Sequence, residues 1–234
     1  MLYQPIQHPY VTKDKTLHLS TTRRSFRAES TSEFVHHLLM GNVEKARSTY
    51  QTIKPTYPLY ITRDLNIAKR WLRERRQDIE RSGLLMSSRA GRLRAIGLEL
   101  RKESTYDKVV NWFLGDRQDI ESSDFLEVAL GEFFVQGLEL DWTAVVWDAD
   151  LRYKDKADDC WSIHNLRGGK WNNTRDIKER DYQLNGYRVI LTRARIGMII
   201  VVPEGNVDDP TRDPLYYDCT YEYLKGLGIE EIYE

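Results

Sequence analysis

The sequence has few of the features that several classes of protein require. Only two of its 234 residues are cysteine, Cys160 and Cys219, and they show no metal-binding or redox spacing, which excludes a disulfide framework. The longest apolar runs are about six residues, far below the roughly 20 needed to cross a bilayer. The first residues show no basic-then-apolar signal. We therefore expect free thiols, no membrane partner and a cytoplasmic location.

The sequence also lacks an excess of charge of either sign. Lys and Arg together number 35 and Asp and Glu 36, which gives a net charge of −1. A strongly basic footprint for nucleic acid is therefore absent from the chain as a whole, and any contact with nucleic acid has to come from local patches. Hydrophobic residues make up 41% of the chain, which is enough for one sizeable core.

Motifs for most other chemistry are missing. No Gly-x-Ser-x-Gly elbow is present, and the histidines have no zinc-binding spacing, so we expect no metal centre. The run Gly168-Gly169-Lys170-Trp171 has no Ser or Thr after the lysine and no earlier glycine at the required spacing, so it is not a phosphate loop. Asp148, Asp150 and three further aspartates before residue 160 lack the glycine and terminal glutamate of a calcium loop, and we interpret them as a solvated loop.

What the sequence does contain is an alternation of short apolar runs with amphipathic segments. The apolar runs predict strands at 17–20, 58–61, 84–86, 125–130, 144–147 and 198–202. Ser30 and Glu33 form a capping box that predicts the start of one helix. Asp64 predicts the start of another, which we expect to extend to Gly83. Further helices are expected at about 46–53, 93–100, 179–193 and 217–224.

This alternation is typical of an α/β fold with a buried, mostly parallel sheet flanked by helices. Residues 1–16 are polar, and we expect them to be a flexible lead-in to a single domain at 17–234. The polar stretch at about 148–180 contains two adjacent glycines and two tryptophans. We interpret it as an insertion or hairpin within that domain.

Two segments carry the main candidate site, and the first lies on the approach to a buried strand. In it, Gln136 and Gly137 precede Glu139. Glycine lets the backbone turn sharply and approach a ligand closely, so that Glu139 could accept hydrogen bonds from ribose hydroxyls or from a neighbouring arginine. The alternative interpretation is a glycine bulge beside a solvated glutamate.

The second segment places Arg193 and Arg195 between an expected helix and an expected strand. An arginine finger at Arg193 would neutralise the charge that builds on a transferring γ-phosphoryl group, because the guanidinium fork matches phosphate oxygens. The alternative is that these cations only complement the dipole at the carboxyl end of the helix.

Three more arginines lie between the first expected strand and the first expected helix. They are Arg23, Arg24 and Arg27. Ligands in open α/β sheets usually bind where a parallel strand ends, so these arginines are candidates for contact with phosphate. The alternative is a surface cluster paired with Glu29 and Glu33.

A further set of candidates follows the expected strand at 84–86. Its members are Ser87, Ser88, Arg89 and Arg92. Arginine and hydroxyl side chains can donate hydrogen bonds to the phosphates of a nucleic-acid backbone. We therefore predict that this loop contacts the backbone of a nucleic acid.

The order and spacing of these segments resemble a known family. From about Leu17 to Leu224, the chain resembles the C-terminal half of the Schlafen group 3-like DNA/RNA helicase domain, a superfamily 1 helicase-like family. The resemblance rests on four stretches, 19–29, 85–91, 132–142 and 185–198, of which the last two are the most specific. They contain Gln-Gly-Leu-Glu-Leu-Asp-Trp at 136–142 and Leu-Thr-Arg-Ala-Arg at 191–195.

The resemblance implies the second RecA-like domain of a superfamily 1 motor, in which ATP binds between two RecA-like domains. Arg193 would be the finger that reaches the γ-phosphate. Arg24 would be a second arginine on the same phosphate, with Arg27 as the alternative to Arg24. The segment 136–139 would approach the nucleotide, with Glu139 on its sugar. Single-stranded nucleic acid would cross the top of both domains.

The sequence departs from a complete motor in one respect. It contains neither the Gly-x-x-x-x-Gly-Lys-Ser/Thr loop nor the acidic Mg²⁺-binding motif of a first motor domain. We therefore expect no ATP hydrolysis by this polypeptide alone, and use of ATP with Mg²⁺ only together with a first RecA-like domain, in cis or in trans.

The expected function is ATP-coupled movement on nucleic acid, or its remodelling. One alternative is a non-catalytic nucleic-acid- or protein-binding module that retains the helicase fold. Another is an unrelated α/β enzyme with its site in the 148–180 insertion.

Overall fold

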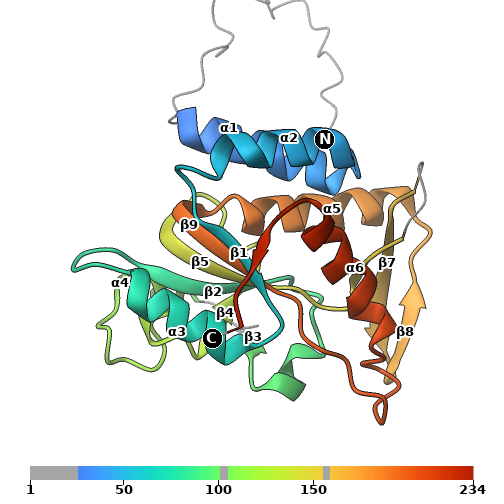
Figure 1. The fold of residues 1–234 in the computed structure, drawn as a ribbon. Coiled ribbons are helices and arrows are strands. Elements are labelled where there is room, and N and C mark those ends of the chain that lie inside the picture. Colours follow the sequence, from blue (N-terminus) through green and yellow to red (C-terminus); the bar gives the residue numbers. More distant parts are fainter. Residues whose placement is uncertain (1–25, 101–104, 155–158, 234) are drawn as a thin grey trace, which may run out of the picture.

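The structure, a computed structural model, describes residues 26–100, 105–154 and 159–233 (Figure 1). Within this part, a seven-stranded parallel sheet forms the centre, and helices pack on both of its faces. The predicted α/β fold is therefore confirmed. The lead-in expected at 1–16 and the strand expected at 17–20 lie outside the described residues.

The strands of the central sheet follow the order β10-β1-β9-β5-β2-β4-β3, and each neighbouring pair is parallel. Their bounds are β1 Leu59–Thr62, β2 Ser82–Met86, β3 Glu99–Leu100, β4 Val128–Leu130, β5 Leu140–Val146, β9 Ala194–Val201 and β10 Glu230–Glu231. β5 pairs with β2 on one side and β9 on the other, and every residue of β5 is buried. A strand that is covered on both faces appears in the sequence as a continuous apolar run.

Two groups of helices cover the sheet. The described helices are α1 Phe26–Leu39, α2 Val43–Ile53, α3 Leu65–Arg75, α4 Tyr106–Leu114, α5 Ile177–Leu191 and α6 Leu215–Gly226, with short 3₁₀ helices η2 Leu93–Ile96 and η3 Ser123–Phe125. α1, α2, α5 and α6 contribute to one apolar core, and α3 contributes to the other. In Figure 1, α1 and α2 form a layer on the outer side of α5. No described helix is long and apolar enough to cross a membrane.

Successive residues of the central strands point to opposite faces of the sheet, as the period of a strand requires. In β9, Met198 and Ile200 belong to the core that includes α5, whereas Ile199 and Val201 belong to the core that includes α3. Full burial of one such side chain contributes roughly 1.5–3 kcal/mol. The side chains of the apolar run that predicted this strand therefore pack on both faces of the sheet.

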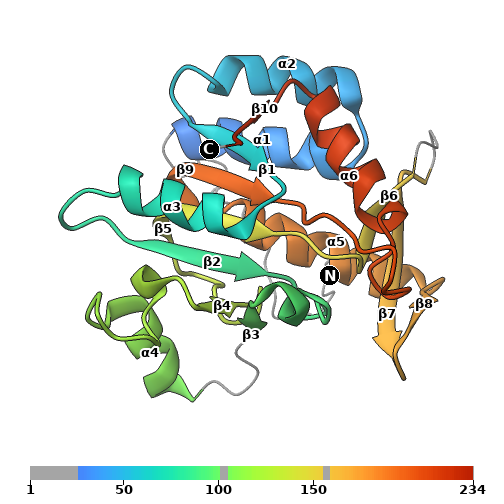
Figure 2. The ribbon, with the colours of Figure 1, turned by 60° about the horizontal axis from the view of Figure 1, so that its bottom comes forward.

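The described part of the polar stretch at 148–180 contains a smaller antiparallel sheet. Its strands are β6 Leu151–Tyr153, β7 Trp161–Arg167 and β8 Lys170–Asn173. Gly168 and Gly169 make the turn between β7 and β8 with φ angles of +57° and +72°, a left-handed geometry that favours glycine. In Figure 2 this sheet lies at the opposite end of the molecule from α4, and the arrowheads of β2 and β9 point toward it.

The first predicted helix and the helix expected at 93–100 differ in extent from the observed ones. α1 begins at Phe26, so Ser30 lies within the helix instead of capping it. The helix expected at 93–100 is reduced to η2, because Gly97 takes a left-handed φ of 81° and ends the turn. The chain then enters β3. Glycine is the residue that most often ends a helix in this way.

α3 starts as predicted but ends early. The Asp64 side chain accepts a hydrogen bond from the main-chain nitrogen of Asn66 at 2.6 Å, which is the expected N-terminal cap. The helix ends at Arg75, and Gly83 lies in β2, so the predicted end is wrong. Ile79 is 93% exposed, and the polar residues around it provide no apolar face that would hold a longer helix against the sheet.

The packing of β5 against β9 gives a stability prediction. At Gly197, an added Cβ would lie 2.6 Å from Cζ3 of Trp142 and 2.8 Å from the main-chain oxygen of Pro58. We expect Gly197→Ala to lower the free energy of unfolding by about 1–3 kcal/mol, because the extra methyl group overpacks the core. Urea denaturation measures this change.

The matched control is Gly226→Ala, since an added Cβ at Gly226 meets nothing within 4 Å. We expect the free energy of unfolding of this variant to stay within about 1 kcal/mol of the native value. Equal stability of the two variants would show that the strands are not packed as closely as described.

Candidate functional site

The parallel sheet divides the candidate residues between two edges. Gln136, Gly137 and Glu139 come before β5, and Arg193 comes immediately before β9, so they lie at the amino edge of the sheet. The loop 87–92 follows β2 and lies at the carboxyl edge, on the side of β7 and β8 (Figure 2). The candidates for nucleotide contact and those for nucleic-acid contact therefore occupy separate surfaces.

Arg193 lies with its guanidinium group folded against the main chain. Its Nε donates to the oxygen of Val189 at 3.1 Å, and its Nη1 donates to the oxygen of Leu138 at 3.2 Å. A third hydrogen bond joins Nη2 to Oγ1 of Thr192 at 3.3 Å. Arg193 is 8% exposed. In this conformation the cation complements the carboxyl end of α5, which is the helix-end interpretation of the segment.

The same contacts bring the two most specific sequence segments together. Leu138 belongs to the segment 136–142, and Arg193 belongs to the segment 191–195. The main-chain nitrogen of Leu140 also donates to the oxygen of Arg193 at 3.0 Å. The candidate nucleotide residues of both segments therefore lie side by side at one edge.

Gly137 provides the sharp turn expected before β5. Its φ is +84°, and an added Cβ there would meet nothing within 4 Å. The left-handed backbone, and not crowding, is therefore what favours glycine at this position. Gln136 and Glu139 on either side are exposed. The turn thus presents an open surface, which suits both a glycine bulge and a close approach by a ligand.

Asp141 anchors the start of β5, a role that the sequence did not reveal. Its Oδ1 accepts from Nη2 of Arg195 at 2.5 Å, and its Oδ2 accepts from the main-chain nitrogen of Arg81 at 2.9 Å. Asp141 is 5% exposed. Its hydrogen bond and charge raise the pKa of the Arg195 guanidinium, and the charge of Glu139 adds to that rise. A buried carboxylate therefore holds Arg195 beside the candidate segment.

The remaining phosphate candidates stay predictions. Arg23 and Arg24 lie outside the described residues, and Arg27 belongs to the first turn of α1, where the backbone alone is described. α1 contacts α5, the helix that ends next to Arg193.

At the carboxyl edge, Glu132 holds the loop that follows β2. Its Oε2 accepts from the main-chain nitrogen of Ser88 at 2.8 Å, and its Oε1 accepts from Oγ of Ser88 at 2.6 Å. Gly186 of α5 leaves room for this side chain, since an added Cβ would lie 3.3 Å from Cγ of Glu132. Three of the stretches that carry the resemblance, containing Ser88, Glu132 and Gly186, therefore meet at this point.

Ser87 and Arg92 stabilise the same loop through internal contacts. Oγ of Ser87 accepts from the main-chain nitrogen of Arg89 at 3.1 Å and from Nε2 of Gln183 at 2.9 Å. Nη2 of Arg92 donates to Oδ2 of Asp209 at 2.7 Å. Ser87 is 2% exposed. Contact of Ser87 and Arg92 with nucleic acid stays a prediction. In the structure, the hydrogen bonds of both side chains stabilise the loop itself.

Asp148 and Asp150 are buried, so their interpretation as solvated loop residues is wrong. They are 1% and 0% exposed. Asp148 accepts from the hydroxyl of Tyr217 at 3.0 Å. Asp150 accepts from the hydroxyl of Tyr187 at 2.7 Å and from Nε2 of Gln183. Hydrogen bonds replace the water that both carboxylates lose on burial, and they tie the carboxyl end of β5 to α5 and α6.

Burial also changes the acidity of this cluster. Loss of solvent raises the pKa of Asp150 to about 7, and the neighbouring Asp148 carboxylate adds to the rise. Burial likewise raises the pKa of Asp148 and raises that of Tyr187 well above its ordinary value. The charge of the cluster therefore changes near neutral pH.

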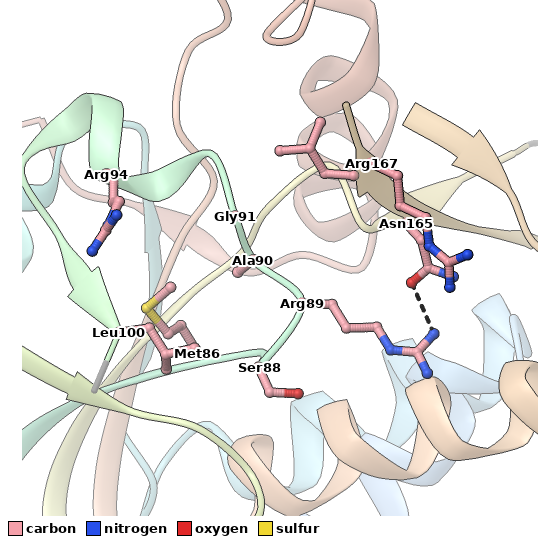
Figure 3. A pocket seen from close by; sticks show the side chains of 10 residues that line it. Met86, Ser88, Arg89, Ala90, Gly91, Arg94, Leu100, Asn165 and Arg167 are labelled. Carbon is pink, nitrogen blue, oxygen red and sulfur yellow. Dashed lines mark hydrogen bonds between the residues drawn. The ribbon is translucent and has the colours of Figure 1, made fainter. Parts of the chain in front are cut away.

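A cavity of about 360 Å³ lies between the loop 87–92 and the hairpin of β7 and β8. Its lining consists of Met86, Ser88, Arg89, Ala90, Gly91, Arg94, Leu100, Asn165, Leu166 and Arg167. Figure 3 shows Arg89 extended toward Asn165, and its Nη1 donates to Oδ1 of Asn165 at 3.1 Å. Ser88 and Arg89 were predicted as candidates for contact with nucleic acid. Asn165 and Arg167 were not, because no sequence signal indicates which side of the insertion packs against the loop.

The parallel seven-stranded sheet flanked by helices is of the RecA-like class. The family model of the Schlafen group 3, DNA/RNA helicase domain matches residues 2–204, and the chain belongs to this family. A search of curated proteins found no match. Membership in the family indicates a helicase-like domain that interacts with nucleic acid.

The buried carboxylates give a prediction about pH. The pKa of Asp150 is about 7 in the folded chain and near 4 in an unfolded chain, so between these values only the folded chain holds the proton. The free energy of unfolding should therefore decrease as the pH rises from about 4 to about 7. Asp150→Asn has no proton to lose at this position. We expect a flatter profile for this variant between about pH 4 and about pH 7, measured by urea denaturation.

The control for this prediction is Asp107→Asn, which neutralises an exposed carboxylate in the first turn of α4. This variant should keep the loss of stability that burial of Asp150 causes between about pH 4 and about pH 7. If the native and Asp150→Asn chains lose the same stability between about pH 5 and about pH 8, Asp150 does not titrate as described.

Proposed function

We propose that this chain is the C-terminal motor domain of a superfamily 1 DNA/RNA helicase-like ATPase. It would complete an ATP site between two RecA-like domains and grip single-stranded DNA or RNA. The observation that carries the proposal is the contact between Arg193 and Leu138 at the amino edge. This contact joins the two segments that are most specific to the family. Family membership supports the helicase-like class.

The chemistry of the amino edge suits a phosphate. Three hydrogen bonds of Arg193 go to neutral oxygens, and a phosphate oxygen would form a stronger, charge-assisted bond with the same guanidinium group. In the proposed role, Arg193 turns from Leu138 toward the γ-phosphate when a first domain closes. Arg24, or Arg27 in its place, adds a second guanidinium group. The segment 136–139 borders the nucleotide, with Glu139 toward the sugar.

These residues fit one side of an ATP site. The printed sequence contains no phosphate loop and no acidic Mg²⁺-binding motif, so the described residues offer no cradle for the β-phosphate. ATP with Mg²⁺ therefore requires a first RecA-like domain, in cis or in trans. The contribution of this chain is to neutralise charge on the transferring phosphoryl group.

We assign the grip on nucleic acid to the carboxyl edge. Ser88 and Arg89 line the cavity there, together with two further arginines. Guanidinium and hydroxyl donors hold the phosphates of a strand in position without reading its sequence. A motor that moves along a strand requires such a sequence-tolerant grip.

A second candidate function is a binding module that keeps the fold without the catalysis. The observation in its favour is the position of Arg193, which is 8% exposed and bonded to the end of α5. The two functions differ in whether a bound nucleotide changes the affinity for a nucleic-acid strand. With a first domain supplied, an ATP analogue should change the affinity of the motor for a labelled single strand, whereas a binding module would be indifferent to it.

The arginine finger can be tested by ATP hydrolysis. In a protein that contains this domain and a first RecA-like domain, we expect Arg193→Ala to lower ATP turnover about 10³-fold or more, because arginine fingers contribute roughly 10³–10⁵ to kcat. Arg188→Gln, in the last turn of α5 and bonded to Asn185, is the control and should retain turnover. Turnover of the Arg193→Ala protein within about threefold of native would refute the finger assignment.

The grip can be tested by the salt dependence of strand binding. Arg89→Ala should weaken the binding of a labelled single strand and lower the slope of log affinity against log salt by about 0.7, the value for one lost phosphate contact. Arg75→Ala removes the same charge from the end of α3, at the opposite edge of the sheet. The slope of this control should not change, and equal slopes for the two variants would remove Arg89 from the interface.

A further inference from the structure

The cavity beside Arg89 has a composition that a phosphate grip alone does not explain. Three arginines line it, and no carboxylate is among the lining residues. Four of the other lining residues, Met86, Ala90, Leu100 and Leu166, are apolar. Contact with phosphates requires surface cations, but it does not require an apolar floor. The cavity therefore suits a ligand with both an anionic and an apolar part.

The floor of the cavity belongs to the rigid part of the fold. Met86 is the last residue of β2 and is 1% exposed, and Ala90 in the following loop is 3% exposed. Leu100 lies in β3 and packs against the apolar cluster that includes Met86 (Figure 3). An added Cβ at Gly91 would lie 3.2 Å from Cδ2 of Leu166, so the loop and the hairpin are in close contact. The cavity is thus preformed by two segments that are distant in the sequence.

The rim of the cavity is cationic and partly fixed. The hydrogen bond from Nη1 of Arg89 to Asn165 and an ion pair with Glu179 at 3.3 Å hold the Arg89 guanidinium in place. Arg94 is paired with Glu99 at the surface. Arg167 is exposed, and no ion pair joins it to another described residue. Arg167 is therefore the rim cation with the least competition for a phosphate.

We propose that this cavity takes one nucleotide of a single-stranded nucleic acid, with the base on the apolar floor and the adjoining phosphate on the arginine rim. The inference rests on the proposed function, because the carboxyl edge is where the strand is expected. A volume of about 360 Å³ lies within the range of small-ligand pockets. Unstacked bases commonly lie against apolar side chains or arginine planes in proteins that bind single strands.

The cavity should discriminate weakly between bases. Asn165 is the lining side chain best suited to read a base edge, but its groups are already engaged. Its Oδ1 accepts from Arg89, and its Nδ2 donates to Oγ1 of Thr174 at 2.8 Å and to Glu179 at 3.3 Å. The presence of a base should therefore matter more than its identity.

The test compares two labelled strands of equal length, one of oligothymidine and one with the same backbone but no bases. Fluorescence anisotropy of the intact chain should show that the base-bearing strand binds about fivefold more tightly or better, as expected for a stacked base. Oligouridine and oligoadenosine strands should bind within about threefold of oligothymidine. Equal binding of the base-bearing and abasic strands would overturn the proposal and leave the phosphate grip intact.

Two further measurements locate the effect. A strand that carries iodinated uracil should photo-crosslink to residues 86–94 or 165–167, and crosslinks confined to other residues would overturn the proposal. Arg167→Ala should weaken binding of the base-bearing strand about threefold or more, whereas Arg75→Ala should stay within about twofold. If neither strand binds the native chain at low salt, the proposed grip on nucleic acid fails, which is a result distinct from failure of the cavity alone.

Discussion

The parallel pairing of β5 with β2 and β9 is the constraint on which the rest of the structure depends. Every residue of β5 is buried, so a shift of its register would move apolar side chains out of both cores. Because these strands run in one direction, residues that precede β5 and β9 share the amino edge, and residues that follow β2 and β5 share the carboxyl edge. The separation of Arg193 from Arg89 follows from strand direction alone.

The fold class was predictable because its central strands are covered on both faces and appear in the sequence as uninterrupted apolar runs. Helix ends were predictable only where the contact is local. Asp64 caps α3 through a residue two positions away, whereas the end of α3 depends on where the chain turns back into β2. α4 was not predicted, and its buried Trp112 packs against strands that are distant in the sequence. Spacing along the chain does not encode such contacts.

The candidate site was likewise predictable only in part. The segments that contain Gly137 and Arg193 were found from their sequences and family likeness, and the structure places them together. The burial of Asp148 and Asp150 was not predicted. The sequence of an acidic segment does not show whether water or protein hydroxyl groups donate hydrogen bonds to its carboxylates. The lining contributed by Asn165 was missed for a related reason, since the packing of an inserted hairpin is set by tertiary contacts alone.

The segment 131–139 runs from the end of β4 back to the start of β5, and each of its ends is fastened at a different edge. Glu132 is bonded to Ser88 at one end, and the oxygen of Leu138 is bonded to Arg193 at the other. The two fastenings lie on one continuous piece of backbone. A single segment of nine residues, 131–139, therefore borders both candidate surfaces of the sheet.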